Sequence, residues 1–424
     1  MLNDINPVKP KERHIILDAL RGIALLGICL ANYPEFSLYT FQDNEVVAAM
    51  PTAGLDKIIK YLQYIFIDGK FYTLFSILFG IGFSIILSNF SQNNSNIPNG
   101  SNIPNGSNIP SGSNGIKVFY RRMLILFIIG LLHLLLLWAG DILILYAFLG
   151  FFLPLFRNVS NKKLLIYSVV LLLFPIVMDA CTVVLGWNLS APVISATQYF
   201  HGQAGITDNN FAVWLVESKS YPDVLRFNLA GSFIRMQEFI EGNRAFKVFG
   251  LFLIGLYIGK NKIYANLEDN RILLKKISFY GFITGFPASI LYAWSAMNSH
   301  PLGLITHSLI YALSVVPLSL AYISMICLWY IKNKKRTVFK IFAAPGRMAL
   351  TNYIMQSVIG IIIFYGVGFS MGATTGLVHV ELIAIVVFGL QILYSHLWLS
   401  YSKFGPLEWI WRIFTYGKWL KLTK

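Results

Sequence analysis

The chain has 424 residues, of which 56% are hydrophobic and 12% are charged, and its formal net charge is +15. A soluble domain carries about 25% charged residues, so this composition cannot build a water-facing surface around the whole protein. Apolar runs of roughly 20 residues recur along the chain and predict membrane-spanning helices. The apolar–polar alternation of a transmembrane barrel is missing. We therefore expect an all-α integral membrane protein.

The first region, residues 1–90, holds two apolar runs. Asp18 and Arg21 interrupt the start of the first run, whereas a cleavable signal peptide has an uncharged apolar centre. This run is therefore expected to remain as a permanent helix. The second run contains Gly80 and Gly82, which we expect to allow close helix packing because glycine lets backbones approach.

Residues 91–118 form a low-complexity region. The hexapeptide SNIPNG occurs twice in a row and then decays to SNIPSG. Such a segment has little apolar surface to bury, so it predicts a disordered cytoplasmic linker. A solenoid is disfavoured because three hexamers are too few to stack a core.

The remaining chain divides into four regions. Residues 119–186 hold helices three to five, and residues 187–244 form a polar and aromatic extracytoplasmic loop. The amphipathic part of that loop, residues 224–240, is expected to lie at the membrane interface. Residues 245–401 hold helices six to ten, and residues 402–424 form a basic, tryptophan-rich cytoplasmic tail typical of an interfacial anchor. The predicted membrane-spanning helices, about ten in all, cover residues 15–34, 64–90, 119–138, 142–156, 164–186, 245–259, 277–297, 302–331, 349–369 and 380–401.

The basic residues sort by side across these ten helices. With an even number of helices both termini lie on one side, and 25 of the 34 Lys and Arg residues fall there, against 8 on the other side and Arg21 within the first helix. The positive-inside rule assigns the Lys- and Arg-rich side to the cytoplasm. Both termini are therefore predicted to be cytoplasmic, and the positive charge indicates orientation in the bilayer rather than a nucleic-acid partner.

The three cysteines are dispersed in apolar runs, at Cys29, Cys181 and Cys327. They are too few and too far apart for a disulfide framework or a zinc site. We interpret them as small hydrophobic residues in helix contacts and expect no metal site.

Ionisable residues near the predicted inner face include a pair in the first helix. Asp18 and Arg21 are three residues apart, so they are neighbours on one helical face. One interpretation is an ion pair that lowers the cost of membrane insertion; the alternative is a site in which Arg21 binds a ligand phosphate or carboxylate. Arg121 and Arg122 lie at a similar predicted depth, and these three arginines are the candidate cofactor-binding residues.

A second pair flanks the predicted outer turn of the hairpin between helices three and four, at Gly140 and Asp141. His133 lies eight residues before Asp141. If the hairpin folds them together, they fit a general base and its orienting carboxylate. The alternative is a histidine bonded to a neighbour only for packing.

Other ionisable residues lie near the predicted outer face. Asp68, Lys70 and His307 are candidate substrate-binding residues, because ionisable groups at membrane depth are costly and often functional. The remaining histidines in apolar or short-loop positions are expected to be solvated or structural: His300, His379 and His396.

Several stretches of the chain resemble the YeiB-like family of bacterial inner-membrane proteins. They span both ends of the chain, and the resemblance implies a multi-pass protein of the bacterial cytoplasmic membrane in a family that has been described as transport-related. The matching stretches are LDALRGIALLGICLAN (17–32), GKFYTLFSILFGIGF (69–83), GLLHLLLLWAGDILILYAFLG (130–150), GRMALTNYIMQS (346–357) and GPLEWIWRIFTY (405–416).

The opening of the chain also resembles the wider group of transmembrane acyltransferases, which includes the heparan-glucosaminide acetyltransferase type and the bacterial O-acyltransferases. Those enzymes move an acyl group from cytoplasmic acyl-CoA to a sugar or lipid on the far side. Arg21 matches the arginine of the O-acyltransferase pattern, but Asn32 stands where that pattern has its catalytic histidine. Asparagine cannot act as a base near neutral pH, so either His133 replaces it or this branch has lost the chemistry.

The leading hypothesis is therefore a ten-helix membrane acyltransferase. Arg21, with Arg121 or Arg122, would bind the phosphates of acyl-CoA, and His133, oriented by Asp141, would act as base toward a small-molecule, glycan or lipid acceptor. The alternative is a transporter or permease for a small anion or metabolite, and a third interpretation is a non-catalytic membrane protein. The lipid bilayer is the expected environment, and the sequence leaves open whether the chain forms a homodimer.

Overall fold

A computed structural model describes residues 14–95, 113–207, 209–333 and 335–424. Over these residues the protein is helical, and the only bridge between extended segments in the described chain joins Ser402 to Thr423. The expected all-α class is confirmed. The α-helices are α1 (Ile15–Phe36), α2 (Asn44–Ala49), α3 (Ala53–Phe66), α4 (Lys70–Ser95), α5 (Ser113–Leu132), α6 (Leu143–Gly150), α7 (Asn161–Leu185), α8 (Ala191–Ala204), α9 (Phe211–Glu217), α10 (Tyr221–Glu241), α11 (Arg244–Lys260), α12 (Arg271–Met297), α13 (Gly303–Lys332), α14 (Thr337–Arg347), α15 (Ala349–Phe364), α16 (Leu377–Tyr401) and α17 (Pro406–Tyr416).

Six helical segments of the described chain are long and apolar enough to cross a membrane. The bent pair of α14 and α15, which meet at 73°, gives a seventh if it is counted as one span. The protein is thus a membrane protein with several spans, and the count of about ten remains a prediction. The six segments are Ile15–Phe36, Ala53–Ser88, Gly115–Leu137, Asn161–Leu185, Gly303–Lys332 and Leu377–Tyr401.

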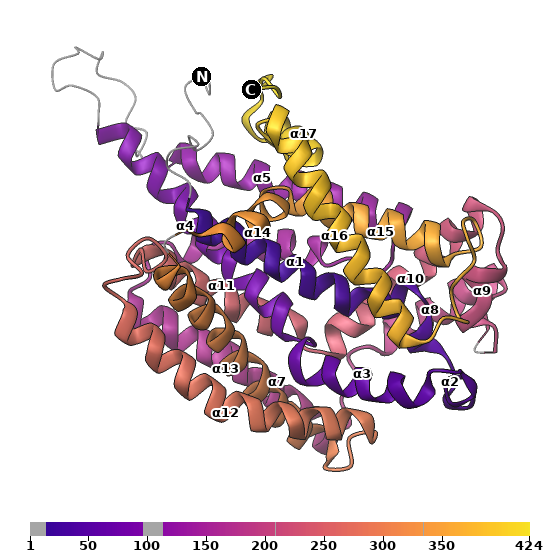
Figure 1. The fold of residues 1–424 in the computed structure, drawn as a ribbon. Helices are drawn as coiled ribbons and strands as arrows, with labels where there is room; N and C mark the ends of the chain where they lie inside the picture. Colours follow the sequence, from indigo (N-terminus) through magenta and orange to yellow (C-terminus); the bar gives the residue numbers. More distant parts are fainter. Residues whose placement is uncertain (1–13, 96–112, 208, 334) are drawn as a thin grey trace.

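The bundle has two ends, which we name by the elements found there. At the α17 end, the helix α17 packs on the start of α5, where the Trp411 indole donates a hydrogen bond to the Arg122 carbonyl at 3.0 Å. At the hairpin end, the turn after α5 packs on α10, where Arg235 Nε donates to the Ala139 carbonyl at 3.3 Å. Figure 1 shows α17 at the top of the bundle and α2 and α9 away from it, at the lower right.

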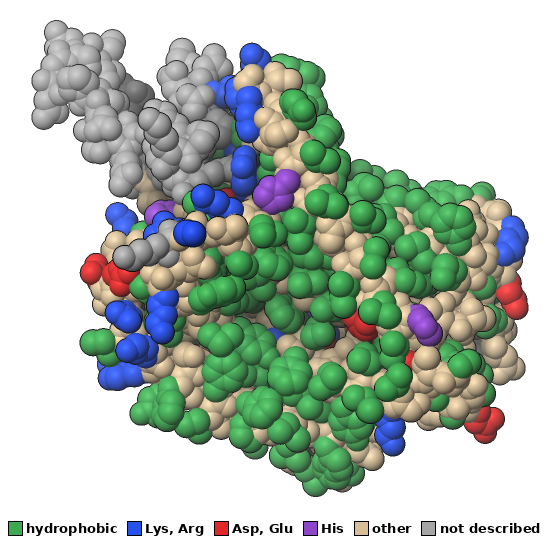
Figure 2. Space-filling view, viewed as in Figure 1, with side chains coloured by type: hydrophobic (Ala, Val, Ile, Leu, Met, Phe, Trp, Pro, Cys, Tyr) green, Lys and Arg blue, Asp and Glu red, His purple; other side chains and the backbone are tan. Residues whose placement is uncertain are grey.

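The surface reflects the same arrangement. Figure 2 shows hydrophobic side chains over the broad middle of one face, with Lys and Arg side chains gathered mainly toward its upper and left margins. Exposed hydrophobic residues are common on the described helices, for example Val184, Leu397 and Ile272. Lipid is the environment in which such a surface is stable, since a soluble monomer rarely exposes apolar patches larger than a few hundred Å².

Glycines let α1 and α14 pack backbone to backbone. A β-carbon at Gly22 would lie 2.0 Å from the Phe342 carbonyl oxygen, and one at Gly346 would lie 1.8 Å from the Asp18 carbonyl oxygen. Neither position therefore accepts a larger residue without moving a helix. This contact fixes the start of α1, and with it the Asp18 side chain, beside the end of α14.

The two glycines predicted to pack closely in the second helix behave differently. A β-carbon at Gly80 would lie 2.1 Å from the Phe252 carbonyl oxygen, so α4 and α11 do touch there. The prediction for Gly82 is wrong, because no atom lies within 4 Å of its β-carbon position and Gly82 instead lines a cavity.

The predicted extracytoplasmic loop 187–244 is largely helical, so its description as a loop is wrong. It contains α8, α9 and α10, and α10 packs on α8 and on the π-helical turn η3 (His133–Leu137). Val224, Phe227 and Ala230 are buried along one face of α10. The amphipathic pattern of α10 suggests an interfacial helix, but its apolar stripe packs in part against other helices of the protein. Both arrangements need one apolar stripe.

Helix boundaries also differ from those predicted. The second predicted helix begins at Lys70 rather than at residue 64, after a turn in which Gly69 has φ +75°. The fourth is shorter than expected, because α6 has 8 residues and a separate 3-10 turn, Leu153–Phe156, follows it. At about 1.5 Å per residue, α6 alone is too short to cross a bilayer core of about 30 Å.

The low-complexity region is partly outside the described residues. Helix α4 continues to Ser95 and α5 begins at Ser113, so both margins of the predicted linker 91–118 are helical. The repeats themselves, at residues 96–112, lie outside the described residues.

Candidate functional site

A cavity of about 500 Å³ runs through the bundle between its two ends. This volume lies within the roughly 300–1,000 Å³ of ligand pockets. Its middle is lined by aliphatic and aromatic side chains of α1, α4 and α5, such as Leu25, Phe79 and Leu126, whereas charged side chains line both ends. Asn32 also lines the cavity. It stands where the acyltransferases that the chain resembles have their catalytic histidine.

Arginines dominate the lining at the α17 end. Arg21 is held by Asp18 at 2.7 Å, and its side chain is 28% exposed. The Arg122 guanidinium stacks on the Trp411 ring with its central carbon 3.7 Å from the ring centroid. Stacking leaves the edge of a guanidinium available to donate hydrogen bonds to an anion. Four arginines line this end: Arg21, Arg122, Arg347 and Arg412.

A carboxylate from α17 meets the first turn of α15 at the same end. Glu408 Oε1 accepts hydrogen bonds from the backbone amides of Leu350 at 2.7 Å and Thr351 at 3.1 Å, and Oε2 accepts one from Thr351 Oγ1 at 2.6 Å. A negative charge is favourable at a helix N-terminus because the free amides and the helix dipole point at it. Burial nevertheless raises the pKa of Glu408 above its usual value, against these hydrogen bonds.

The structure separates the two neighbouring arginines predicted to bind a cofactor. Arg122 lines the cavity, but Arg121 Nη2 donates to the Phe414 carbonyl at 2.8 Å on α17, and Arg121 is not among the lining residues. Consecutive residues on an α-helix point about 100° apart, and here Arg121 points toward α17 while Arg122 faces the cavity. Arg121 is therefore withdrawn as a candidate ligand of the cavity.

Acidic and basic groups alternate at the hairpin end of the cavity. Arg235 donates to Glu35 at 3.3 Å and to Glu238 at 2.6 Å. Arg244 lies over the Tyr72 ring, 4.9 Å from its centroid. Glu35, Arg235 and Arg244 all line the cavity. Opposite charges are thus paired or adjacent here, unlike the arginine-rich α17 end.

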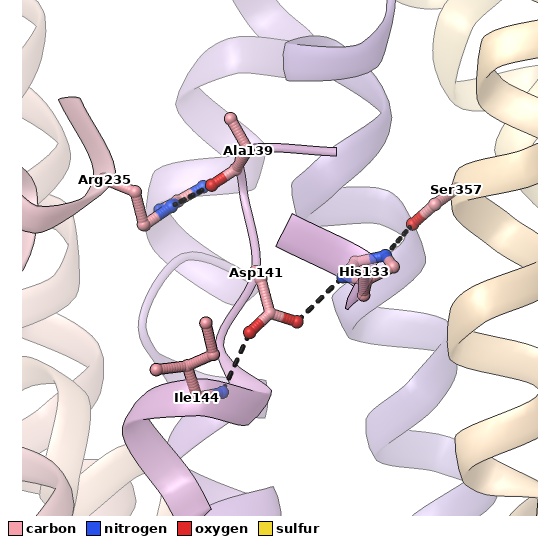
Figure 3. A network of polar contacts seen from close by, with 6 residues as sticks. All are labelled: His133, Ala139, Asp141, Ile144, Arg235 and Ser357. Carbon is pink, nitrogen blue, oxygen red and sulfur yellow. Dashed lines mark hydrogen bonds and ion pairs between the residues drawn. The ribbon is translucent and has the colours of Figure 1, made fainter. Parts of the chain in front are cut away.

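Three side chains form a hydrogen-bonded chain next to this end, as Figure 3 shows. Asp141 Oδ2 lies 2.8 Å from His133 Nδ1, and His133 Nε2 lies 2.8 Å from Ser357 Oγ. His133 is 2% exposed, Asp141 1% and Ser357 1%. The hairpin therefore brings His133 and Asp141 together, and α15 adds a serine on the other side of the imidazole.

Local geometry holds both members of the hairpin pair in place. His133 begins a π-helical turn in which the Trp138 amide donates to the His133 carbonyl at 2.9 Å, and such turns occur often at functional sites. Asp141 Oδ1 accepts a hydrogen bond from the Ile144 amide at 2.9 Å, at the start of α6. The two contacts fit the tautomer in which His133 Nδ1 donates to the Asp141 carboxylate and Nε2 accepts from the Ser357 hydroxyl.

The three predicted substrate-binding residues gather around one tyrosine. The Tyr292 hydroxyl donates to Asp68 at 2.5 Å, the Lys70 amine lies 5.2 Å from the Tyr292 ring centroid, and the His307 ring lies 5.3 Å from it. Asp68 lines the cavity, whereas Lys70 and His307 do not. Lys70 is fully buried and donates to the Tyr64 carbonyl at 2.6 Å.

Sequence reasoning missed several residues of the site. Nothing in the spacing of Ser357, Arg412 or Glu408 singles them out, because their partners are far away in the chain. One signal was available: all three lie within stretches 346–357 and 405–416, which carry the family resemblance.

Comparison with known proteins finds bacterial relatives that match the chain over nearly its whole length. It is 30% identical to "Uncharacterized protein YxaH" of Bacillus subtilis (strain 168), over 100% of this chain and 99% of the relative. It is 26% identical to "Uncharacterized 39.9 kDa protein in amylase 3'region" of Bacillus acidopullulyticus, over 98% and 97%. It is 27% identical to "Uncharacterized protein YeiB" of Escherichia coli (strain K12), over 95% and 96%.

Two further comparisons complete this result. No solved structure matches the chain. Residues 258–418, from the end of α11 to just beyond α17, match the family described as "Protein of unknown function (DUF418)". The chain is thus a member of the YeiB-like family of membrane proteins that carries this C-terminal region.

Proposed function

We propose that the protein is a membrane acyltransferase that takes an acyl group from acyl-CoA and transfers it to a hydroxyl or amine acceptor. In this proposal it crosses the bacterial cytoplasmic membrane about ten times, with both termini in the cytoplasm. The α17 end of the cavity then faces the cytoplasm, where acyl-CoA is found, and the hairpin end faces the acceptor.

The observation that carries the proposal is the difference in charge between the two ends of the cavity of about 500 Å³. Its arginine-rich end suits the phosphates of a nucleotide-bearing donor, because guanidinium groups bind phosphate through paired hydrogen bonds. Its apolar middle suits an acyl chain and a pantetheine arm. Gly140 and Tyr353 line the cavity, whereas His133, Asp141 and Ser357 lie behind this wall and are not among the lining residues. The proposal places the thioester against this wall, where a small movement of Tyr353 would open it to His133.

Each group then has a definite role. Arg21 and Arg122 bind the phosphates, and Trp411 keeps the Arg122 guanidinium flat against the cavity wall. His133 removes a proton in the acyl-transfer step, and Asp141 positions its imidazole and stabilises the imidazolium that forms. The helices α8 to α10, which lie within the predicted extracytoplasmic loop 187–244, cover the acceptor side.

The proposal is tested with the full-length protein in lipid nanodiscs. Binding of radiolabelled acetyl-CoA is titrated, with dephospho-CoA as competitor and with the Arg21→Ala variant. We expect saturable binding of acetyl-CoA to wild type, and an affinity at least tenfold lower in Arg21→Ala. Competition by dephospho-CoA measures how much the additional phosphate of CoA contributes to binding. Arg226→Ala, on the exposed ion pair with Asp223, is the matched control. Equal affinity of wild type and Arg21→Ala would remove the donor role of this end.

A transporter is the second candidate, and the cluster around Tyr292 favours it. Asp68, Lys70 and His307 are ionisable groups at membrane depth that the acyl-transfer scheme does not use, as expected for a substrate or proton pathway. Substrate counterflow in proteoliposomes that needs no CoA and is lost in Asp68→Asn would favour transport over acyl transfer.

A further inference from the structure

The hydrogen bonds of His133 leave it no free nitrogen. Nδ1 is bonded to Asp141 and Nε2 to Ser357, each at 2.8 Å. A histidine acts as a base through an unprotonated nitrogen, and here that nitrogen already accepts from the serine hydroxyl. The first proton that His133 can take is therefore the proton of Ser357.

Ser357, like Ser295 beside His307 Nδ1 at 3.0 Å, bonds a histidine ring, and it differs in this from other buried helical serines. Ser168 and Ser319 donate to the carbonyl of the residue four positions earlier, at 2.8 Å and 2.7 Å, which is the usual way for a helical serine to satisfy its hydroxyl. Among the hydrogen bonds of the described residues, the Ser357 hydroxyl has only the one to His133. Its proton is thus committed to the imidazole rather than to its own helix.

Tyr353 connects this serine with the cavity. It precedes Ser357 by four residues on α15, so the two side chains share a helix face. Tyr353 lines the cavity, and its ring centroid lies 5.1 Å from that of His133. Its hydroxyl is buried and makes no hydrogen bond of ordinary geometry within the described chain, although the Ile142 backbone interacts with it. A tyrosine hydroxyl near the histidine, on the cavity wall, is suited to donate to an oxyanion.

From this geometry we infer that Ser357 is the nucleophile of the protein and carries the acyl group as a covalent ester between two half-reactions. This inference rests on the proposed acyl transfer and deepens it, because it replaces direct transfer by a double displacement. Serine, histidine and aspartate come from α15, the π-helical turn and the hairpin turn, and together they form the arrangement by which enzymes activate a hydroxyl.

The chemistry balances with the donor and acceptor classes already named. Ser357 Oγ attacks the thioester carbonyl carbon while its proton passes to His133 Nε2, and Tyr353 donates to the carbonyl oxygen. The carbon–sulfur bond breaks, and the proton on His133 passes to the sulfur, releasing CoA as a thiol. An acceptor hydroxyl or amine then attacks the serine ester, gives its proton to His133, and the proton returns to Ser357 Oγ as the ester bond breaks.

Two probes on the full-length protein in nanodiscs test the inference. The first is an alkyl fluorophosphonate, which labels activated serines without any CoA. The second is acetyl-CoA, followed by mass spectrometry of the peptide that contains Ser357. Both are applied to wild type and to Ser357→Ala, His133→Gln and Asp141→Asn. Ser395→Ala is the matched control, because Ser395 is also fully buried and bonds a neighbouring side chain, Asn352, at 2.9 Å.

The expected result is one fluorophosphonate adduct and one acetyl group on Ser357 in wild type and Ser395→Ala, and loss of both in the other three variants. A fluorophosphonate adduct without acetylation would support the nucleophile and overturn acetyl-CoA as its donor. Thiol release from acetyl-CoA at the wild-type rate in Ser357→Ala would overturn the inference and leave the proposed function intact. Absence of both adducts in folded wild-type protein would also overturn it.

Discussion

The two ends of the cavity differ in how their charges are satisfied. At the hairpin end, Arg235 is bonded to Glu35 and Glu238. At the α17 end Asp18 holds Arg21, and Glu408 accepts from the first amides of α15. Four arginines line this end, Arg21, Arg122, Arg347 and Arg412, against the two lining carboxylates Asp18 and Glu408.

This difference suggests that the two ends of the cavity have different roles. An excess of guanidinium groups favours a bound anion, so we propose that the α17 end binds a charged ligand. A charge-balanced end beside a hydrogen-bonded Asp–His–Ser chain needs no bound anion and is suited to move protons. Variants at the α17 end should therefore change affinity, and variants at the hairpin end should change rate.

The largest effect is expected for Asp141→Asn. The amide keeps the size of the side chain but cannot stabilise the imidazolium, and loss of this function in a related triad costs about 10⁴-fold in rate. We expect acetyl-CoA thiol release to fall by about 10³-fold or more while acetyl-CoA affinity stays within about threefold of wild type. A fall in affinity with an unchanged rate would reverse the assignment of the two ends.

The next largest effect is expected for Gly346, where α14 packs closely against α1 at the α17 end. A methyl group at Gly346 would overlap the Asp18 carbonyl oxygen, 1.8 Å away, and overpacking of this kind typically costs about 1–3 kcal/mol. Gly346→Ala should lower the thermal midpoint in nanodiscs and weaken acetyl-CoA binding together. Gly54→Ala is the control, because no atom lies within 4 Å of its β-carbon position. Equal midpoints for the two variants would contradict the close α1–α14 contact.

The neighbouring residues Arg121 and Arg122 allow the comparison to be tested one residue at a time. Arg122→Ala removes a guanidinium that lines the cavity, and hydrogen bonds to charged groups contribute about 1.5–3 kcal/mol, so acetyl-CoA affinity should fall roughly 10- to 100-fold. Arg121→Ala removes a side chain directed at the Phe414 carbonyl and should leave the affinity nearly unchanged. Isothermal titration of both variants measures this, and equal losses would mean that the guanidiniums act only through overall charge.

The smallest effect concerns the pH dependence of stability. Burial raises the pKa of Glu408, so the folded protein holds this proton more tightly than the unfolded chain does. Stability from this group is fully present below the ordinary carboxyl pKa of about 4.3 and is lost as pH rises through the raised pKa of Glu408. Relative to Glu408→Gln, the thermal midpoint of wild type should therefore fall modestly as pH increases. A constant difference across pH would contradict the raised pKa.

How well the sequence predicts a contact in this protein depends on how far apart the two residues lie in the chain. His133 and Asp141 are eight residues apart on either side of a glycine-containing turn, so hydropathy and turn signals suffice to bring them together. Ser357 lies 224 residues from His133, and no local pattern reports such a pairing. The same holds for Arg412, whose place at the cavity follows from how α17 returns to the start of α5.

Helix content was harder to predict where polar residues are frequent. Residues 187–244 lack a long apolar run, so they suggest a loop, yet α10 buries Phe227 and Ala230 against neighbouring helices. Hydropathy finds segments that face lipid, but a helix that packs against other protein segments needs only a narrow apolar stripe. Arg121 illustrates the limit at one residue, because hydropathy does not give the direction of a side chain around its helix, and Arg121 points to α17 rather than to the cavity.

The position of α17 has a consequence for biosynthesis. This helix follows every other described helix in the chain, yet it supplies Glu408, Trp411 and Arg412 to the wall of the cavity. Chains fold from the N-terminus as they leave the ribosome, so every preceding helix reaches the bilayer before this wall exists. Maturation of the arginine-rich end is therefore a late, post-insertion event, and a nascent chain truncated before residue 406 would leave the first amides of α15 uncapped.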